Sequence, residues 1–340
     1  MTPNNIHIGV DVSKDKLDVF APGAKRVESV SNGKTGIRRI VELARRNGWT
    51  VCCEATGVYS SALIDGCHDA GVAIAVANPY RVRRYAQGRG ILEKTDEIDA
   101  RLIARYADEN QPRPTPKPTP EERLLRELTD GREFYIRQIQ EVSGRIEQCP
   151  AGSAIRKLLE QTLRQHRKAL AELDGRRTRL VAANAELSRR RNRFMLVQGI
   201  GETVALNVMA AMPELGRLSD KEAAKLAGAA PLANESGREK KKRKIGQGRI
   251  DVRNSLYMAA LVAAFRNPVL KPFYAKLVAK GKPAKVALAA VMRKLVVLLN
   301  RIARNESFAP IVAAKPGKQA TTAHPSRPSA APEVKLPKPG

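Results

Sequence analysis

The stretch IHIGVDVSKDKLDVFAP, residues 6–22, decides the fold of the first third of the chain. Its residues Ile6, Ile8 and Val10 recur at every second position, which is the period of a β-strand with one buried face. The stretch therefore predicts two strands joined by a tight turn, and KRVESVSN at residues 25–32 predicts a third. Helix-spaced and apolar segments alternate after it. Three antiparallel strands followed by alternating helices and strands predict a mixed α/β sheet.

Four acidic residues in this region form a candidate active site: Asp11, Glu54, Asp96 and Asp99. Asp11 closes the first strand, and its side chain lies on the face opposite to the apolar one. Glu54 ends the apolar run VCC. Asp96 and Asp99 are three residues apart in a helical pattern, so both project from one helix face. A charge at the end of a buried strand is costly unless it is paired or functional. We therefore expect the four carboxylates to converge.

Such a cluster predicts a divalent-cation site. Two carboxylates about 4 Å apart repel each other by roughly 4 kcal/mol at an effective dielectric constant near 20. Hard oxygen ligands select Mg²⁺ or Mn²⁺. Two such ions can hold the attacking and leaving oxygens of a phosphodiester during an in-line displacement. Any one of these acids taken alone would be read as an ordinary solvated surface residue, and only their positions favour the site.

The charge of the chain points to nucleic acid. The 340 residues carry a formal net charge of +27. Residues 1–110 hold 16 Lys and Arg against 14 Asp and Glu, whereas the remainder holds 45 against 20. This balance favours a polyanion over a small acidic substrate. Taken alone, it would also suit a ribosomal protein or a protein of the membrane surface.

The four cysteines, Cys52, Cys53, Cys67 and Cys149, have no zinc-site spacing and are expected to be core residues in a reducing cytoplasm. The longest apolar stretch, VALAAVMRKLVVLLN, is interrupted by Arg293 and Lys294. It is too short for a membrane span. We expect a soluble, cytoplasmic protein with no membrane partner.

Composition divides the chain into five parts. A catalytic domain at 1–110 is followed by a proline-rich linker at 111–120, a helical coiled-coil hairpin at 121–192, a helical domain at 193–305 and a disordered basic tail at 306–340. In the hairpin, residues recur at alternating steps of four and three from Leu159 to Leu187, and we call this row the heptad seam. The seam favours dimerisation of the hairpin; the alternative is a hairpin that packs only on itself.

The segment LVQGIGETVALNVMAAM is typical of a helix-hairpin-helix module. Gly199 and Gly201 would form the tight turn, and the helix after them would offer free N–H groups to a phosphate. The alternative is an ordinary helix that starts at a glycine.

A basic loop follows. Between Ser236 and Arg253 there are eight Lys or Arg and two acids. Such a loop could lie along a phosphate backbone, with Arg249 and Arg253 clamping one phosphate. The candidate nucleic-acid-binding residues of the loop are Arg238, Lys240, Lys241, Lys242, Arg243, Lys244, Arg249 and Arg253. By spacing alone, a Ser-Gly pair such as Ser236-Gly237 is most often a turn.

The motifs together resemble one family. GVDVSKDKLDVF, CCEATGVYSSALIDGCHDAG, VANPYRVRRYAQ and KTDEIDARLIARYA, followed by GIGETVALNVMAAM, KLAGAAPLANESG and RNSLYMAALVA, are similar to the DEDD-type insertion-sequence transposases of the one-ten family, relatives of the Piv/MooV invertases. The resemblance runs from about residue 5 to residue 305.

The resemblance implies a RuvC-like, ribonuclease H-like mixed sheet domain with Asp11, Glu54, Asp96 and Asp99 as its metal-binding tetrad, and a helical C-terminal domain with Ser236 as catalytic serine. It also implies a bridge RNA from the flank of the element that pairs with donor and target DNA. With the heptad seam, we expect a homodimer that assembles to a tetramer on DNA.

Residues and resemblance together predict a bacterial, nucleoid-associated DNA transposase or recombinase. It would cut and rejoin strands through a phosphoserine at Ser236, with Mg²⁺ or Mn²⁺, two ions in all, on the acid tetrad. The alternative is a RuvC-like metal-dependent nuclease that acts on branched DNA without a covalent intermediate. A third possibility is a non-catalytic nucleic-acid binder with vestigial acids.

Overall fold

The computed structural model contains all 340 residues, and the structure describes residues 6–91, 93, 96–232, 235–236, 239–240 and 244–308. The tail predicted at 306–340 therefore lies almost wholly outside the described residues. The chain forms two compact units, Met1–Thr119 and Pro120–Gly340.

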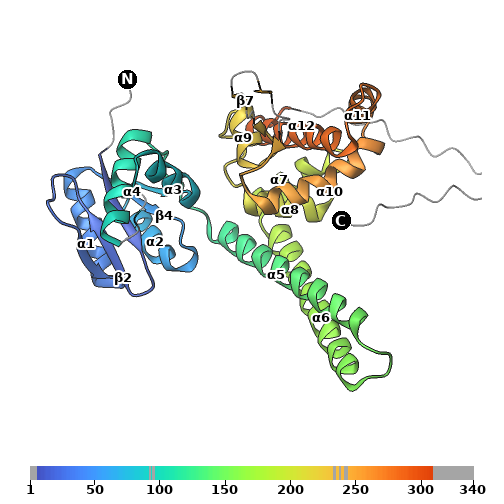
Figure 1. Ribbon diagram of the computed structural model, residues 1–340, viewed down its shortest axis with the longest axis horizontal. Coiled ribbons are helices and arrows are strands. Elements are labelled where there is room, and N and C mark those ends of the chain that lie inside the picture. Colours follow the sequence, from blue (N-terminus) through green and yellow to red (C-terminus); the bar gives the residue numbers. More distant parts are fainter. Residues whose placement is uncertain are drawn as a thin grey trace, which may run out of the picture. The chain divides into compact units, whose positions relative to one another are not determined.

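A five-stranded mixed sheet is the centre of the first unit (Figure 1). Its strands are β1 (His7–Val12), β2 (Lys16–Phe20), β3 (Glu28–Ser31), β4 (Thr50–Glu54) and β5 (Ile74–Ala77), in the order β3-β2-β1-β4-β5. The first three are antiparallel, and β4 and β5 run parallel to β1. The predicted mixed α/β sheet is thus confirmed.

Helices cover both faces of this sheet. The helices α1 (Lys34–Asn47) and α2 (Ser61–Asp69) pack on one face, where Ile8 and Val10 of β1 are fully buried. On the other face lie α3 (Pro79–Gly88) and α4 (Asp96–Asn110), against Cys52 and Ala75. The alternation of side chains along each strand divides the strand between the two cores.

The contact between β1 and α4 is unusually close. A Cβ added to Gly9 would lie 2.3 Å from the carbonyl oxygen of Ala100 and 2.4 Å from the amide nitrogen of Ala104. Only a residue without a side chain fits here. At one end of the same contact, the His7 N–H donates to Asp108 Oδ1 at 3.0 Å, and the His7 ring Nδ1 lies 3.0 Å from the same oxygen.

The proline-rich segment at 111–119 contains no helix or strand and attaches to β5. The Thr115 N–H donates to the Ile74 carbonyl at 2.7 Å, and Thr115 Oγ1 accepts from the Val76 N–H at 3.0 Å. His68 Nε2 lies 2.9 Å from the Thr115 carbonyl oxygen. The segment is therefore part of the first unit.

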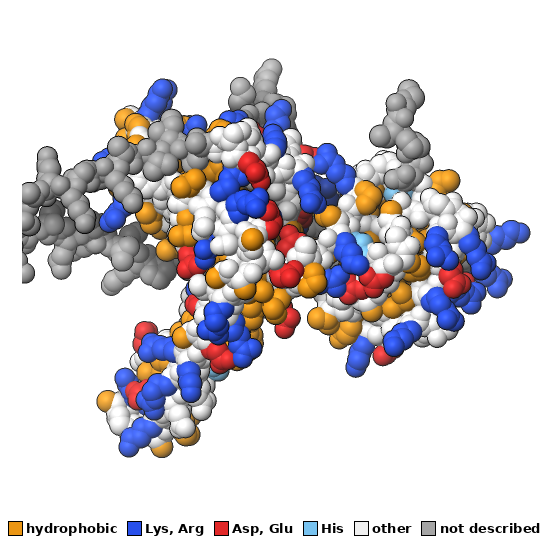
Figure 2. Space-filling model, turned by 180° about the vertical axis from the view of Figure 1, so that it is seen from behind, with side chains coloured by type: hydrophobic (Ala, Val, Ile, Leu, Met, Phe, Trp, Pro, Cys, Tyr) orange, Lys and Arg blue, Asp and Glu red, His pale blue; other side chains and the backbone are white. Residues whose placement is uncertain are grey.

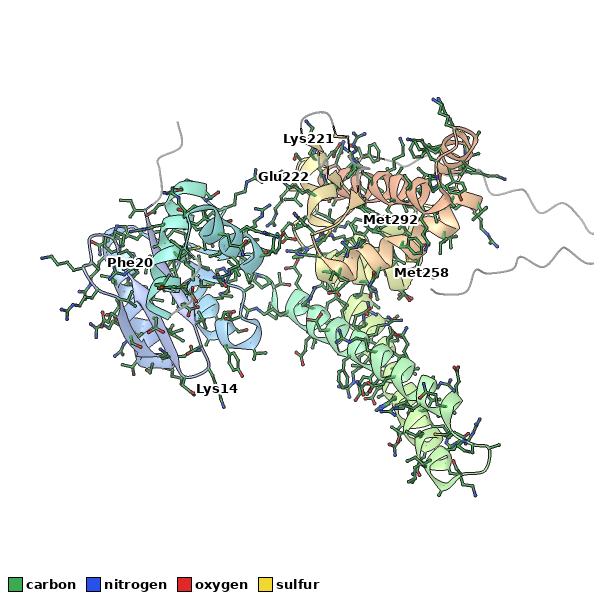
Figure 3. The ribbon with its side chains drawn as sticks, in the orientation of Figure 1. Lys14, Phe20, Lys221, Glu222, Met258 and Met292 are labelled. Atoms are coloured by element: carbon green, nitrogen blue, oxygen red, sulfur yellow. The ribbon has the colours of Figure 1, made fainter. Side chains whose placement is uncertain are left out.

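The second unit is built from helices around one core. Its helices are α5 (Pro120–Gln148), α6 (Ala154–Ala183), α7 (Ala185–Met195), α8 (Glu202–Ala211), α9 (Asp220–Leu226), α10 (Ile250–Arg266), α11 (Leu270–Ala279) and α12 (Ala284–Arg304). Met292 of α12 is buried in that core, whereas Met258 of α10 is exposed (Figure 3). Over the described residues, no helix is both long and apolar enough to cross a membrane.

The helices α5 and α6 form a hairpin within one chain (Figure 1). The heptad seam was expected to continue in one helix to Leu187, and this is wrong. The side chain of Asn184 accepts from the Leu187 N–H at 3.0 Å and so caps a new helix, α7. Leu187 turns into the helical core. Dimerisation through the remaining seam stays a prediction.

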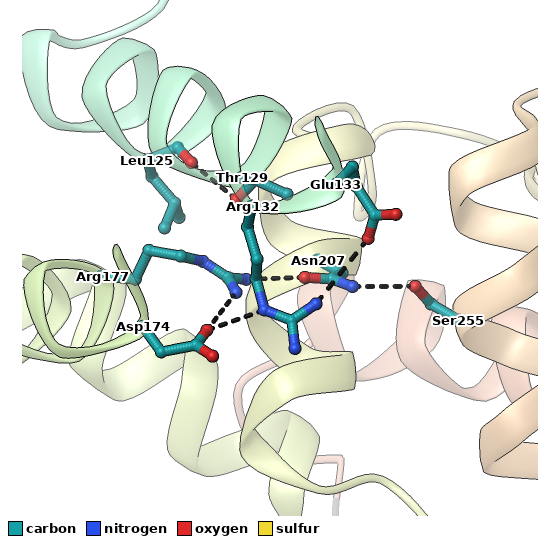
Figure 4. A network of polar contacts seen from close by, with 8 residues as sticks. All are labelled: Leu125, Thr129, Arg132, Glu133, Asp174, Arg177, Asn207 and Ser255. Atoms are coloured by element: carbon teal, nitrogen blue, oxygen red, sulfur yellow. Dashed lines mark hydrogen bonds and ion pairs between the residues drawn. The ribbon is translucent and has the colours of Figure 1, made fainter. Parts of the chain in front are cut away.

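A polar network holds the root of this hairpin to the helical core (Figure 4). The Arg177 side chain is only 1% exposed; its Nη2 donates to Asn207 Oδ1 at 2.6 Å and its Nη1 to Asp174 Oδ1 at 3.2 Å. Asn207 donates in turn to Ser255 Oγ at 3.0 Å, and Arg132 donates to Asp174 at 2.7 Å. The network joins α5, α6, α8 and α10, and burial lowers the pKa of Arg177.

Gly9→Ala is expected to lower the free energy of unfolding of the first unit by about 1–3 kcal/mol, because the added methyl group overpacks the contact with α4. Gly88→Ala is the control in the same unit, since nothing lies within 4 Å of its added Cβ. We expect that variant to stay within about 0.5 kcal/mol of the parent. Urea unfolding measures both, and equal midpoints would contradict the described packing of α4 on β1.

Candidate functional site

Asp11 and Glu54 stand level with each other on neighbouring strands. In the parallel pairing of β1 with β4, Gly9 is the partner of Cys52. Asp11 and Glu54 lie two residues further along their strands, so both side chains point to the face that carries α3 and α4. Both are half-buried. The two carboxylates predicted at strand ends are thus placed on the same face and at the same end of the sheet.

The first turn of α4 reaches the same place. On β1, His7 faces Asp108 and Gly9 faces Ala100 and Ala104, so the helix runs antiparallel to the strand. Two strand residues advance about 6.6 Å, which equals four to five helix residues at about 1.5 Å each. Asp11 therefore faces the segment from 96 to 100. Asp99 is half-buried in this turn, and the side chain of Asp96 lies outside the described ones.

The backbone positions of the predicted acids lie at one end of the sheet, but their described side chains do not form a metal-binding cluster. Asp11, Glu54 and Asp99 each have interactions with other groups of the protein. Among the side chains that the structure describes, no three His, Cys, Asp or Glu lie close enough to hold a metal ion. The chemistry of the donor set, carboxylate oxygens only, fits Mg²⁺ or Mn²⁺. The side chain of Asp96 lies outside the described ones. The tetrad is therefore supported by where the four residues lie along the backbone, and not by contacts between their carboxylates.

Three cysteines of the first unit, Cys52, Cys53 and Cys67, are buried. Burial, together with the charges of Glu54 and Asp108, raises the pKa of the Cys52 thiol to about 12. Burial raises the pKa of Cys67 to about 12 as well, and it raises that of Cys53. A thiol that stays protonated is a poor metal ligand and nucleophile. All four cysteines are free. Cys52, Cys53 and Cys67 are buried, as expected of core residues, whereas Cys149 is only half-buried just after the end of α5, so the expectation is wrong for that residue.

A further carboxylate beside the tetrad escaped the sequence analysis. Asp18 of β2 is the antiparallel partner of Asp11, so it shares the face toward α4. It is buried, and Lys16 Nζ lies 3.1 Å from its Oδ2. Further along β2, the guanidinium carbon of Arg101 on α4 lies 5.0 Å from the centre of the Phe20 ring. Lys16, Asp18 and Phe20 alternate with buried Leu17 and Val19, and this alternation was the available signal.

The glycine turn of the second unit is set by packing. Gly199 has a φ of +110°, and its added Cβ would lie 2.8 Å from that of Ala263 on α10. Gly201 caps α8 without a side-chain hydrogen bond. Glu202, in the first turn of α8, pairs with Arg191 at 3.2 Å. The carboxylate of Glu202 thus lies at the N-terminal end of α8, where the phosphate was expected. Phosphate binding at this helix end stays a prediction.

Ser236 lies in a small β-ribbon. Strand β6 (Pro231–Leu232) pairs with β9 (Lys244–Ile245), and between them β7 (Glu235–Ser236) pairs with β8 (Glu239–Lys240). The backbone pairs Ser236 with Glu239. The serine side chain, and the predicted binding residues Arg238 and Lys240 to Lys244, lie outside the described side chains.

The expectation that Arg249 clamps a phosphate does not match its position. Its Nη1 and Nη2 bind Glu214 at 2.8 and 2.6 Å, and Nη1 also donates to the Ala211 carbonyl at 2.5 Å. Both terminal nitrogens of this guanidinium already donate to acceptors within the chain, so they are not available for a bidentate contact with a phosphate. Arg253 donates to the Gln247 carbonyl at 2.9 Å, beside the basic loop. Other Lys and Arg side chains are spread over the hairpin and the helical body (Figure 2).

Two sequence families match the chain. Residues 8–149 match a family described as a transposase, and residues 191–275 match one described as the transposase IS116/IS110/IS902 family. The chain is also similar to the pilin gene-inverting proteins of Moraxella bovis and Moraxella lacunata. Each is 28% identical over 310 residues, which cover 88% of this chain and 95% of the relative.

Among solved structures, the chain is similar to RuvC of Thermus thermophilus, alone and in complex with its Holliday junction substrate. The identities are 20% and 19%, and the TM-score is 0.24 for both. The matches cover 32% and 33% of this chain and 99% of each RuvC chain. Because the two family matches follow each other along the chain and together span more than half of the sequence, the chain belongs to the IS116/IS110/IS902 family of transposases.

Proposed function

We propose that this protein is the recombinase of an insertion sequence, which cuts and rejoins DNA strands through a phosphoserine at Ser236. Family membership supports the transposition of DNA as the overall activity. The observation that carries the site is the convergence of Asp11, Glu54 and the first turn of α4 at one end of the sheet. The inversion named in the titles of the Moraxella relatives is also a recombination.

In the proposed mechanism, Asp11, Glu54, Asp96 and Asp99 would hold Mg²⁺ or Mn²⁺, two ions in all, which would supply positive charge at the scissile phosphate. Asp11 and Glu54 are held by a buried sheet, so their backbones contribute a rigid half of the site. Asp96 and Asp99 are held by α4, whose distance from the sheet is fixed at Gly9. Precise placement of this kind favours an in-line attack.

The covalent step is a transfer between oxygens. Ser236 Oγ forms a bond to phosphorus while the bond from phosphorus to one deoxyribose oxygen breaks, and the serine proton passes through a carboxylate or water to the leaving oxygen. Rejoining reverses the step, as a hydroxyl of a second strand displaces Oγ. Because one phosphoester bond replaces another, the phosphoserine retains the bond energy that rejoining needs. Cations around the serine would stabilise the charge of the transition state.

The proposed partners are donor DNA, target DNA and a structured bridge RNA from the flank of the element, with the protein acting as a homodimer that assembles to a tetramer in the bacterial cytoplasm. The excess of 45 Lys and Arg over 20 acids beyond residue 110 supports a polyanionic partner. The hairpin of α5 and α6 supplies a long surface for a second copy.

Asp11→Asn is expected to reduce strand cleavage by about 100-fold or more, because one electrostatic stabiliser of the transition state is lost. Asp15→Asn is the matched control, since Asp15 lies on the exposed turn after β1. Cleavage of a labelled element end with added Mg²⁺ measures both. DNA binding and the melting temperature should be the same for the two variants. Full cleavage by Asp11→Asn, or in chelator, would refute the metal site.

Ser236→Ala is expected to abolish the covalent protein–DNA adduct, whereas Ser307→Ala at the end of the described chain should leave it intact. Labelled DNA run on a denaturing gel detects the adduct as a band of retarded mobility. If Ser236→Ala still cleaves at the parental rate and no adduct forms in the parent protein, the protein is the metal-dependent nuclease that stands as the alternative.

Purified protein is expected to retain a discrete RNA transcribed from the flank of its own element. Any polycation binds RNA through phosphates, so the test is enrichment over total cellular RNA, read by sequencing the co-purified RNA. A catalytically silent Asp11→Asn protein should show the same enrichment. Random cellular RNA in both preparations would remove the guide from the proposal.

A further inference from the structure

A cavity of about 240 Å³ in the second unit is lined by an unusual number of arginines. It lies between α7, the segment after α8 and the end of α12. The arginines that line it are Arg189, Arg190, Arg193, Arg217 and Arg304. Three glutamates share the wall, so the formal charge of the lining is positive. None of these arginines belongs to the basic loop near Ser236.

Carbonyl oxygens hold most of these arginines in place, and carboxylates do not. Arg190 Nη2 donates to the carbonyls of Met212, Pro213 and Leu215 at 3.3–3.4 Å. Arg193 donates to the Asn305 carbonyl at 2.5 Å, and Arg304 donates to the Leu218 carbonyl. A carbonyl orients a guanidinium and leaves its full charge uncancelled. These side chains are therefore fixed in place and remain able to attract an anion.

The ion pairs of the cavity are concentrated on one arginine. Arg189 lies 3.5 Å from both Glu186 and Glu306. Arg217 makes no ion pair with any residue that the structure describes. Arg190 Nε is buried and has no hydrogen-bond partner among the described atoms. Such a donor needs an acceptor, because a buried N–H without one is destabilising.

We propose that this cavity binds a phosphate of a nucleic-acid backbone. Its volume is below the roughly 300–1,000 Å³ of pockets that enclose a whole small ligand, so it suits one phosphate of a longer chain. Arg189, Arg217 and Arg304 are exposed at its edge, which leaves room for the strand to enter. The inference rests on the proposed function, which supplies the nucleic acid.

The segment of the chain that follows the cavity does not fit it as an occupant. Residues 309–340 carry five Lys or Arg and one acid, so their charge has the same sign as the lining. A backbone phosphate has the opposite sign, and its oxygens match the planar fork of arginine. DNA and RNA share this group, and the experiment separates them.

The test compares two double variants of the full chain that lose the same charge. Arg217→Gln with Arg304→Gln removes two exposed arginines of the cavity. Arg266→Gln with Arg293→Gln removes two exposed arginines elsewhere in the second unit. Binding to labelled single-stranded DNA, double-stranded DNA and RNA of one sequence is measured by fluorescence anisotropy in chelator. Cleavage plays no part there, so failure of the metal or serine chemistry leaves the result intact.

The cavity variant is expected to bind at least one of the three nucleic acids about tenfold more weakly at 0.15 M salt. The slope of log affinity against log salt should fall by about one to two for that nucleic acid. The control variant should lose less than threefold. The nucleic acid with the largest loss identifies the strand that the cavity takes. Equal losses for the two variants with all three nucleic acids, at unchanged melting temperatures, would overturn the proposal.

Discussion

The approach of α4 to β1 at Gly9 is the contact on which the candidate active site depends. The helix backbone lies where any side chain at this position would stand, so the spacing between sheet and helix is set by backbone atoms. Backbone packing of this kind leaves little freedom for the helix to shift. The same contact fixes how far α4 extends past the end of β1. Its first turn, with Asp96 and Asp99, therefore meets the strand where Asp11 lies.

In the second unit, arginines that cannot be told apart in the sequence differ in the groups that they bind in the structure. Arg177 is buried and belongs to the polar network that joins four helices, and Arg249 holds the segment after α8 through Glu214. Burial lowers the pKa of Arg190, with Glu122 acting in the opposite direction, and this guanidinium is held by carbonyls. In a pair such as Arg249 with Glu214, the carboxylate neutralises the positive charge of the arginine. An arginine that is held by carbonyl oxygens keeps its positive charge. The net charge of the chain therefore does not tell which arginines remain available to a ligand.

Alternation along the strands was enough to predict the sheet, because burial on one face leaves a period of two in the sequence. The same period placed Asp11 opposite the apolar face, and helix spacing placed Asp96 with Asp99. The heptad seam failed at Asn184, because periodicity carries no information about a side chain that caps a new helix. The partner of Arg249 was also hidden, since Glu214 lies 35 residues away. Long-range pairing of this kind follows from the packed structure.

The attachment of the proline-rich segment has a consequence for the sheet itself. β5 is an edge strand, and an open edge offers N–H and C=O groups to strands of other molecules. Thr115 occupies the Ile74 carbonyl and the Val76 amide at that edge. Its neighbours, Pro114 and Pro116, have no amide hydrogen, so the added segment cannot extend the ladder further. The stretch that leads out of the first unit thereby also seals one side of it against edge-to-edge aggregation.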